Sequence, residues 1–168
     1  MREIIYAGSF DPAHNGHLNT YLKAMRILKE NIKVCICYNE LKPSGLFRLE
    51  ERMLIAKATF PTDNISSYRT SEEIQKMILN ADLLVRGYRK SCEQEDKEYS
   101  MRLLAYYKSA ELQERILFVE IDDEYEKVSS TIIKEVAKKD INAVSQYVAK
   151  DAFPIIEKRF RELQSGDE

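Results

Sequence analysis

Short apolar runs alternate with longer amphipathic segments along almost the whole chain. The short runs predict strands, expected at residues 3–7, 32–37, 64–68, 82–86 and 115–120. Apolar positions spaced three or four residues apart predict helices, expected at 16–29, 48–59, 71–79, 94–112, 130–138, 142–148 and 151–163. This alternation is typical of a parallel sheet covered on both faces. We therefore predict an α/β fold, a Rossmann-like, doubly wound parallel five-stranded sheet with C-terminal helices.

The predicted sheet also fixes where a ligand should bind. In open α/β sheets the ligand lies outside the carboxyl ends of the strands. The segments expected at that edge follow the strands, at residues 8–17, 38–47, 69–72, 86–92 and 121–131. Residues 1–163 are expected to form a single domain, and residues 164–168 a disordered polar tail.

Composition and charge limit the kinds of partner and the cellular location that we expect for this chain. The 26 basic and 28 acidic residues leave a net charge of −2, so we expect no strong attraction to nucleic acid or to a membrane. No apolar stretch approaches the roughly 20 residues of a spanning helix. The first predicted strand starts at once, which predicts that there is no signal peptide. The three cysteines form no disulfide framework, and together these features predict a cytoplasmic protein.

The most informative segment is the turn between the first predicted strand and helix, G-S-F-D-P-A-H-N-G-H at residues 8–17. His14 and His17 are the only histidines, and their spacing places them on one side of a helical turn. A helix start at this place offers unpaired N–H groups and a positive dipole end, which suit a phosphate. Asn15 could cap this helix. A metal pair is the alternative, although neither a cysteine nor a third histidine is nearby to complete it.

The loop after the second predicted strand carries one candidate ligand. Lys42 lies near a Pro and a Gly, where it could bring a cation to an anionic substrate. The following Leu49-Glu50-Glu51-Arg52 is interpreted as a helix start, in which the acidic residues favour the positive end of the helix dipole. We therefore assign the acidic residues of this segment a structural role.

Two later segments suit phosphate groups. Arg86 and Arg89 flank Gly87 after a buried run, and each guanidinium offers a planar fork of donors. Ser129 or Ser130 can cap the next helix, whose free N–H groups and hydroxyls would then bind triphosphate oxygens.

In order along the chain, the motifs H-N-G-H, K-P-x-x-L-F-x-L-E-E-R, L-V-R-G-Y-R and V-S-S-T-I-I-K-E-V-A resemble those of the phosphopantetheine adenylyltransferases. These enzymes belong to the nucleotidylyltransferases with an H-x-G-H signature. The resemblance covers about residues 3–160. It implies transfer of the adenylyl group of ATP to 4′-phosphopantetheine, which gives dephospho-coenzyme A and pyrophosphate in coenzyme A biosynthesis.

The same resemblance implies residue roles. His17 would stabilise the transition state at the α-phosphorus, and the other catalytic candidates are His14, Lys42 and Arg86. ATP would be bound by Gly8, Ser9, Phe10, His17, Gly87, Tyr88, Arg89, Glu98, Tyr125, Ser129, Ser130 and Thr131. Phosphopantetheine would be bound by Ser9, Lys42, Glu72 and Arg86. Mg²⁺ would be held mainly by the ATP phosphates and not by a protein metal site. The partners would be these substrates, coenzyme A products and copies of the chain in a hexamer.

Some positions differ from the family pattern. His14 stands where these enzymes commonly have Thr, and a full H-x-G-H is more typical of nicotinamide-mononucleotide and cytidylyl members. Segment 90–95 is longer than usual. The family's D-F-E-Y-E becomes D-K-E-Y-S, so the last acidic ATP contact is replaced by Ser100 or moves to Glu98. Glu72 falls near a position that is usually small or apolar. The alternatives are adenylyl or cytidylyl transfer to another small phosphate such as nicotinamide mononucleotide, and a non-catalytic nucleotide-binding module.

Overall fold

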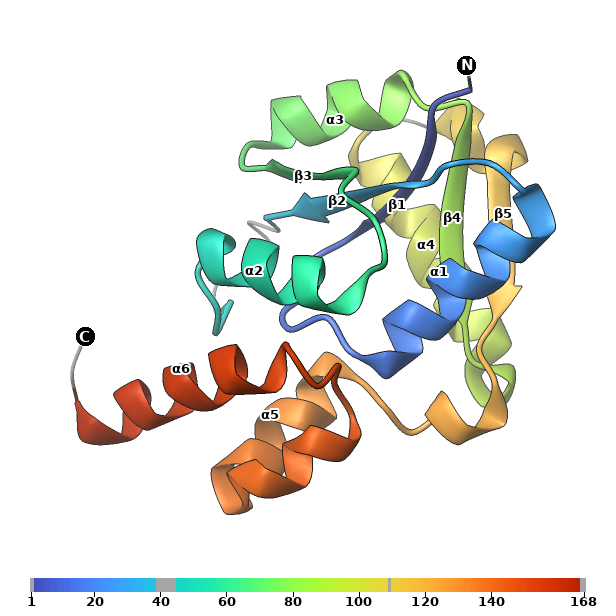
Figure 1. Ribbon diagram of the computed structural model, residues 1–168. Coiled ribbons are helices and arrows are strands. Elements are labelled where there is room, and N and C mark those ends of the chain that lie inside the picture. Colours follow the sequence, from blue (N-terminus) through green and yellow to red (C-terminus); the bar gives the residue numbers. More distant parts are fainter. Residues whose placement is uncertain (1, 39–44, 109, 167–168) are drawn as a thin grey trace.

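The computed structural model describes residues 2–38, 45–108 and 110–166. At its centre is a five-stranded sheet in the order β3-β2-β1-β4-β5, with every neighbouring pair parallel (Figure 1). The strands are β1 (Ile4–Gly8), β2 (Lys33–Cys37), β3 (Ile65–Tyr68), β4 (Leu83–Tyr88) and β5 (Ile116–Glu120). The predicted parallel five-stranded sheet is confirmed.

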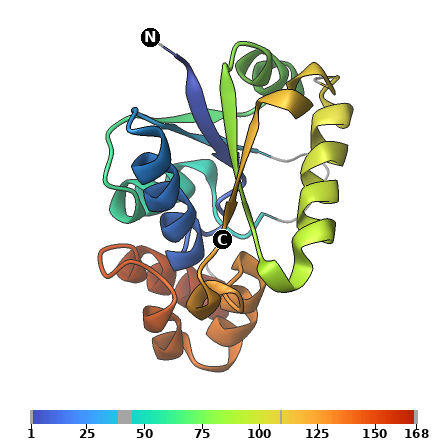
Figure 2. The same cartoon turned by 90° about the vertical axis from the view of Figure 1, so that its right-hand side faces the viewer.

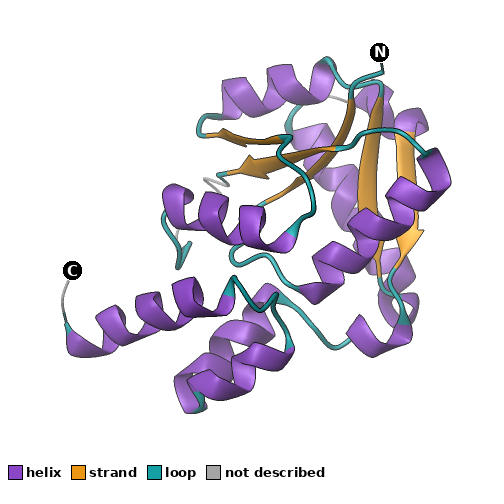
Figure 3. Ribbon diagram, viewed as in Figure 1, coloured by secondary structure: helices purple, strands orange, loops and turns teal. Residues whose placement is uncertain are grey.

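Helices cover both faces of the sheet (Figures 2 and 3). They are α1 (Asn15–Leu28), α2 (Leu49–Thr59), α3 (Ser71–Leu79), α4 (Glu93–Tyr106), α5 (Ser130–Lys139) and α6 (Phe153–Ser165). Short 3₁₀ segments span residues 90–92, 110–115, 123–125 and 141–146. Figure 2 shows α1 and α4 on opposite sides of the sheet, as a doubly wound fold requires.

The two faces bury separate apolar clusters because side chains alternate along each strand. Tyr6 and Val34 point into the cluster that α1 and α2 cover, and this cluster continues into the C-terminal helices. Ile5 and Cys35 point into the cluster that α3 and α4 cover. Among the described residues, no helix is long and apolar enough to cross a membrane.

Three predicted boundaries were wrong. Strand β4 continues to Tyr88 because β5 pairs with it as far as Tyr88 and Glu120, so the R-G-Y motif lies in the strand and not after it. Helix α4 ends at Tyr106, before the predicted end at 112, and Lys108 has a left-handed φ of 53° that no α-helix continues through. The predicted helix at 142–148 is a 3₁₀ segment over 141–146, capped by the Asp140 side chain.

The direction of the strand order reverses between β1 and β4, and in such folds a ligand site lies at this point of reversal. The chain leaves β1 toward α1 on one face and leaves β4 toward α4 on the other (Figure 2). The C-terminal helices α5 and α6 pack beyond the start of α1 (Figure 1). Tyr147 accepts a hydrogen bond from the Asn15 amide at 2.9 Å, which joins them to the first turn.

Candidate active site

A pocket of about 450 Å³ lies at the carboxyl ends of β1 and β4. Its polar lining comes from the turn after β1, from β4 and from the start of α5, and includes Ser9, His14, His17, Arg86, Ser129 and Thr131. Its apolar lining comes mainly from α3 and α4, and includes Ile74, Ile78, Leu103, Leu104 and Tyr107. The pocket therefore offers charged and hydrogen-bonding groups beside an apolar wall.

His14 caps helix α1. Its Nδ1 accepts hydrogen bonds from the amides of Gly16 at 3.1 Å and His17 at 3.4 Å, so Nδ1 carries no proton and the neutral ring holds its proton on Nε2. Burial lowers the pKa of His14 to about 3, which keeps the ring neutral. A Cβ on Gly16 would lie 3.1 Å from the His14 ring, so glycine allows the ring this close approach. The prediction that Asn15 caps the helix was wrong, because its side chain instead donates to the Gln146 carbonyl.

The His17 ring is held between two other rings. It stacks on His14 with centroids 3.7 Å apart, and Phe10 meets it edge-on at 4.9 Å. Burial, and then the neighbouring His14 and Arg86, hold the pKa of His17 well below its usual value. Its Nδ1 is buried without a hydrogen-bond partner among the described residues. A neutral imidazole therefore lines the pocket.

The start of α1 does not offer the unpaired amides that the sequence predicted. Nδ1 of His14 accepts hydrogen bonds from the amides of Gly16 and His17. The Tyr147 carbonyl accepts from the Asn15 amide, and the His14 carbonyl accepts from the Leu18 amide. The physical reason is the imidazole cap, which uses the donors that a phosphate would otherwise use. What α1 still contributes is the positive end of its dipole.

Helix α5 is the more suitable phosphate-binding helix start. Ser129 is its cap and accepts from the Ile132 amide at 3.2 Å, as predicted for one of the two serines. The amides of Ser130 and Thr131 have no acceptor within the described parts of the chain. The Ser130 hydroxyl donates to the Pro12 carbonyl at 2.9 Å, so α5 is fixed to the turn that carries the histidines.

The two arginines of the R-G-Y-R motif differ in how their charge is balanced. Arg86 donates to the Ala7 carbonyl at 2.8 Å and to the Ser100 hydroxyl at 3.1 Å, both neutral groups. Arg89 forms a bidentate pair with Asp96 at 3.0 and 2.7 Å, which raises the pKa of Arg89 and neutralises its charge. Arg86 forms no ion pair with a carboxylate of the described residues, although its charge helps to lower the pKa of Asp96.

Of the predicted site residues, the structure brings ten together in the pocket: Gly8, Ser9, Phe10, His14, His17, Arg86, Gly87, Arg89, Ser129 and Thr131. Tyr125 and Ser130 pack just outside the pocket lining, and Lys42 lies outside the described residues.

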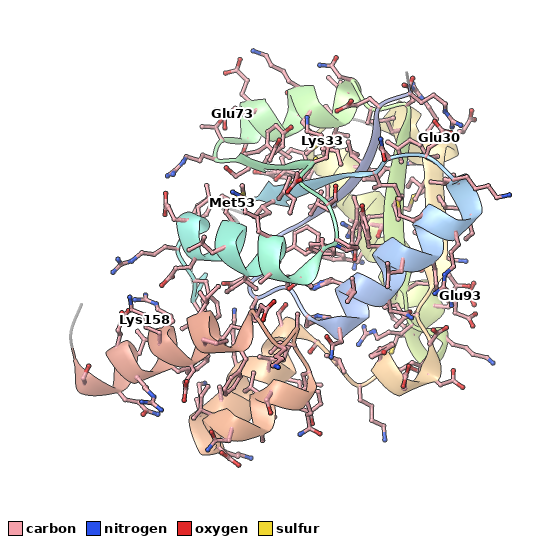
Figure 4. The ribbon with its side chains drawn as sticks, in the orientation of Figure 1. Glu30, Lys33, Met53, Glu73, Glu93 and Lys158 are labelled. Carbon is pink, nitrogen blue, oxygen red and sulfur yellow. The ribbon has the colours of Figure 1, made fainter. Side chains whose placement is uncertain are left out.

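Tyr88, Glu98 and Glu72 do not reach the pocket. Tyr88 donates to Glu120 of β5, and the centroid of its ring lies 4.6 Å from Nζ of Lys97 on α4. Glu98 accepts from Gln94 on the outer side of α4, the surface where Figure 4 labels Glu93. Glu72 is exposed and pairs with Lys76, one turn further along α3. None of the three side chains lines the pocket.

The structure adds lining residues that sequence reasoning missed. Thr20 lies one turn after His17 on α1, and this spacing could have identified it. Cys37 lines the pocket from the end of β2, and burial raises the pKa of its thiol to about 12, so it stays protonated. Ser100, which the sequence named only as the replacement of an acidic ATP contact, lines the pocket and accepts a hydrogen bond from Arg86.

Residues 5–136 of the chain match the family model described as cytidylyltransferase-like. The chain belongs to the cytidylyltransferase-like family. Within it, the chain is 32% identical to the phosphopantetheine adenylyltransferase of Prochlorococcus marinus subsp. pastoris, over 81% of this chain and 84% of that protein. It is 26% identical to the enzyme of the same name from Coprothermobacter proteolyticus, over 96% of both proteins. The resemblance to phosphopantetheine adenylyltransferases is therefore confirmed.

A solved structure supports the fold of this cytidylyltransferase-like protein. The crystal structure of Thermotoga maritima TmcAL bound with alpha-thio ATP matches with a TM-score of 0.63 and 14% identity. The match covers 99% of this chain, which spans 57% of that larger protein. At this identity the match shows a shared fold alone.

Proposed function

We propose that this protein transfers the adenylyl group of ATP to 4′-phosphopantetheine and releases dephospho-coenzyme A and pyrophosphate. The observation that carries the proposal is a single pocket in which a neutral, buried His17 with an unpaired nitrogen lies with the cation Arg86, which pairs with no carboxylate of the described residues. The relatives named phosphopantetheine adenylyltransferase support the choice of acceptor.

The reaction needs positioning and charge stabilisation more than acid–base chemistry. An oxygen of the acceptor's phosphate attacks the α-phosphorus of ATP, the bond between that phosphorus and the α–β bridging oxygen breaks, and pyrophosphate leaves with the electron pair. A phosphate monoester is already ionised at neutral pH, so no general base is required. The neutral His17 donates a hydrogen bond to the charge that develops at the α-phosphate, and one such donor is worth about 10²–10³ in rate.

The helix start of α5 and the turn after β1 would hold ATP. The amides of Ser130 and Thr131 and the Ser129 hydroxyl are donors for triphosphate oxygens at the positive end of the α5 dipole. Gly8, Ser9 and Phe10 would bring backbone to the nucleotide, and Gly87 and Arg89 line the same pocket. Contacts of ATP with Tyr88, Glu98 and Tyr125 stay predictions that require side chains to move.

The acceptor has an anionic end and a long uncharged arm, and the pocket has a matching division. Arg86 would bind the phosphate, together with Ser9 and Lys42. The wall of Ile74, Leu103 and Leu104 would take the arm. Glu72 stays a prediction as an acceptor contact.

We propose that Mg²⁺ enters with ATP, held by the phosphate oxygens, where it would neutralise charge on the leaving pyrophosphate. The described residues form no group of three or more His, Cys, Asp or Glu side chains able to hold a metal. Asp11, the carboxylate within the signature turn, is already paired with Arg52 and Lys134. We also propose, on the resemblance, a cytoplasmic enzyme that assembles as a hexamer.

A substrate panel tests the proposal. The protein is incubated with Mg²⁺, with ATP or CTP, and with 4′-phosphopantetheine, nicotinamide mononucleotide or glycerol phosphate, and pyrophosphate is measured. We expect release with ATP and phosphopantetheine well above every other pair. The second candidate, adenylyl or cytidylyl transfer to another small phosphate, rests on the complete H-x-G-H alone, and the named relatives do not favour it. Release with one of those pairs and none with phosphopantetheine would replace the first proposal by the second.

A further inference from the structure

Ser100 of α4 is a buried hydroxyl in the pocket lining that the proposed chemistry does not use. The residue is 3% exposed. The resemblance described above implies an acidic contact with ATP at this position, where this chain carries a serine. A buried hydroxyl is stable only where its polar groups are satisfied, so its partners indicate what it does.

The partners of Ser100 are an arginine of the pocket and the preceding turn of its own helix. Its hydroxyl accepts a hydrogen bond from Nε of Arg86 at 3.1 Å and donates to the Asp96 carbonyl at 3.1 Å. The donation to Asp96 fixes the direction of the hydroxyl hydrogen, so a lone pair of the oxygen faces Arg86. The hydroxyl of Ser100 is thus already used in holding the guanidinium.

Two neutral acceptors hold Arg86 in place. Its Nη1 donates to the Ala7 carbonyl at 2.8 Å, while Nε donates to Ser100. The other N–H groups of the guanidinium, on Nη1 and Nη2, have no acceptor within residues 2–38, 45–108 and 110–166. The nearby carboxylate of Asp96 is paired with Arg89 instead. The orientation of Arg86 is therefore fixed by uncharged groups, and donors remain for an anion in the pocket.

The face of α4 that carries Ser100 also carries part of the apolar wall. Leu103 and Leu104 follow Ser100 by three and four residues, and all three line the pocket. The charge of Arg86 contributes to the low pKa of His17, so the guanidinium also lies near the proposed reaction centre. No hydrogen bond in the described parts of the chain joins Arg86 or Ser100 to the start of α5. Arg86 thus lies where the apolar wall meets His17.

We propose that Ser100 is a positioning residue for the acceptor: it holds the Arg86 guanidinium at the end of the α4 wall without pairing its charge. The inference deepens the proposed function and rests on its assignment of Arg86 and the wall to the acceptor. The arrangement suits a phosphate on Arg86 that carries an uncharged arm along Leu103 and Leu104. A direct contact between position 100 and ATP predicts the opposite kinetic effect.

The test compares Ser100→Ala and Ser100→Thr with Ser67→Ala, which makes the same change at an exposed position of β3 outside the pocket lining. The KM for each substrate, kcat and the thermal unfolding midpoint are measured. We expect Ser100→Ala to raise the KM for the acceptor by about 10-fold while the KM for ATP changes by less than about threefold. Ser100→Thr keeps the hydroxyl and should stay near the wild type, as should Ser67→Ala. If Ser100→Ala unfolds, Ser100→Cys takes its place, because a thiol fills the space but is a weak acceptor.

A double-mutant cycle shows whether Ser100 acts through Arg86. In the Arg86→Ala background, Ser100→Ala should cause no further loss of kcat/KM for the acceptor, because the guanidinium that it positions is gone. An equal loss in both backgrounds would overturn the proposal. An unchanged KM for the acceptor in Ser100→Ala, or an equal rise in both KM values, would also overturn it.

Ser100→Glu separates this role from a contact with ATP. A carboxylate at position 100 would pair with Arg86, so the KM for the acceptor should rise further than in Ser100→Ala. Ala105→Glu adds the same charge at an exposed position of α4 and should match the wild type. A lower KM for ATP with an unchanged KM for the acceptor would make position 100 an ATP contact and overturn the proposal.

The acceptor used in these measurements is the one that supports pyrophosphate release in the wild type. Absence of release with phosphopantetheine therefore contradicts the proposed function. The comparison of the two KM values among the variants decides the role of Ser100.

Discussion

At the scale of single residues, His14 has a structural role that its position in the motif did not reveal. Its Nδ1 caps α1 and its ring stacks on His17, so it positions the catalytic candidate. A threonine at this place could also cap the helix through its hydroxyl. The departure from the common family residue therefore preserves the cap and adds a ring beside His17.

The cap predicts a specific dependence of stability on pH. The folded pKa of His14, about 3, lies below the usual 6.5, so the folded state favours the neutral ring. This contribution is complete above pH 6.5 and is lost as the pH falls toward 3. We expect the free energy of unfolding of the wild type to fall more steeply than that of His14→Thr, by up to about 1.4 kcal/mol per pH unit. His17 is present in both proteins and its pKa shifts in the same direction, but His14 contributes to that shift, so the difference between the two proteins reports on both rings. Parallel urea-unfolding curves from pH 7 to 5 would contradict the cap.

Substitutions of Ser129 distinguish its role as a helix cap from its proposed role in binding phosphate. Ser129→Ala should lower the free energy of unfolding by about 1 kcal/mol, because the Ile132 amide loses its acceptor. Ser129→Asp keeps a good cap and places a negative charge beside the triphosphate, so it should remain stable and raise the KM for ATP more than Ser129→Ala does. Urea unfolding and steady-state kinetics on both variants measure this. An unchanged KM for ATP in Ser129→Asp would move the triphosphate away from this helix.

At the scale of elements, Asp11 joins the signature turn to α2 and α5. Its carboxylate pairs with Arg52 and with Lys134, at 3.3 and 2.5 Å, and is 8% exposed. Removing one partner of a buried ion pair leaves the other uncompensated, at a cost of about 3–5 kcal/mol. We expect Asp11→Ala to reach this range and Lys134→Ala, whose side chain is 24% exposed, to cost clearly less. Equal losses in chemical unfolding would show that the carboxylate is not the centre of the network.

The elements also show which parts of the fold a sequence can reveal. The strands were predicted nearly to the residue. Four of them are apolar runs, whereas the edge strand β3 carries two serines and is only partly buried. Errors fell where a partner decides the boundary: β4 extends through Gly87 and Tyr88 only because β5 pairs with it. The same distinction between local patterns and distant partners applies to the candidate site. His17, Arg86 and Ser129 were predicted from local motifs. The contacts of Arg52 with Ser9 and of Arg86 with Ser100 join separate segments, and no local pattern encodes such contacts.

At the scale of the whole molecule, the reversal of strand order between β1 and β4 makes the pocket. The turn after β1 supplies the histidines, β4 supplies Arg86, and the chain after β5 returns to set α5 against the same turn. Hydrogen bonds from Ser130 and ion pairs at Asp11 join these parts, so the two substrate sides are built on one rigid edge of the sheet. Catalysis by positioning requires such an edge.

Product analysis tests the central claim most directly. The wild type and His17→Ala are incubated with ATP, Mg²⁺ and 4′-phosphopantetheine, and the products are followed by ³¹P NMR with mass spectrometry. We predict that the wild type converts the acceptor's phosphomonoester into the diphosphate diester of dephospho-coenzyme A, with one pyrophosphate per product. We predict that His17→Ala forms the same product about 10²–10³ times more slowly. An acceptor phosphate left unchanged by the wild type, or an equal rate in His17→Ala, would contradict this account of the site.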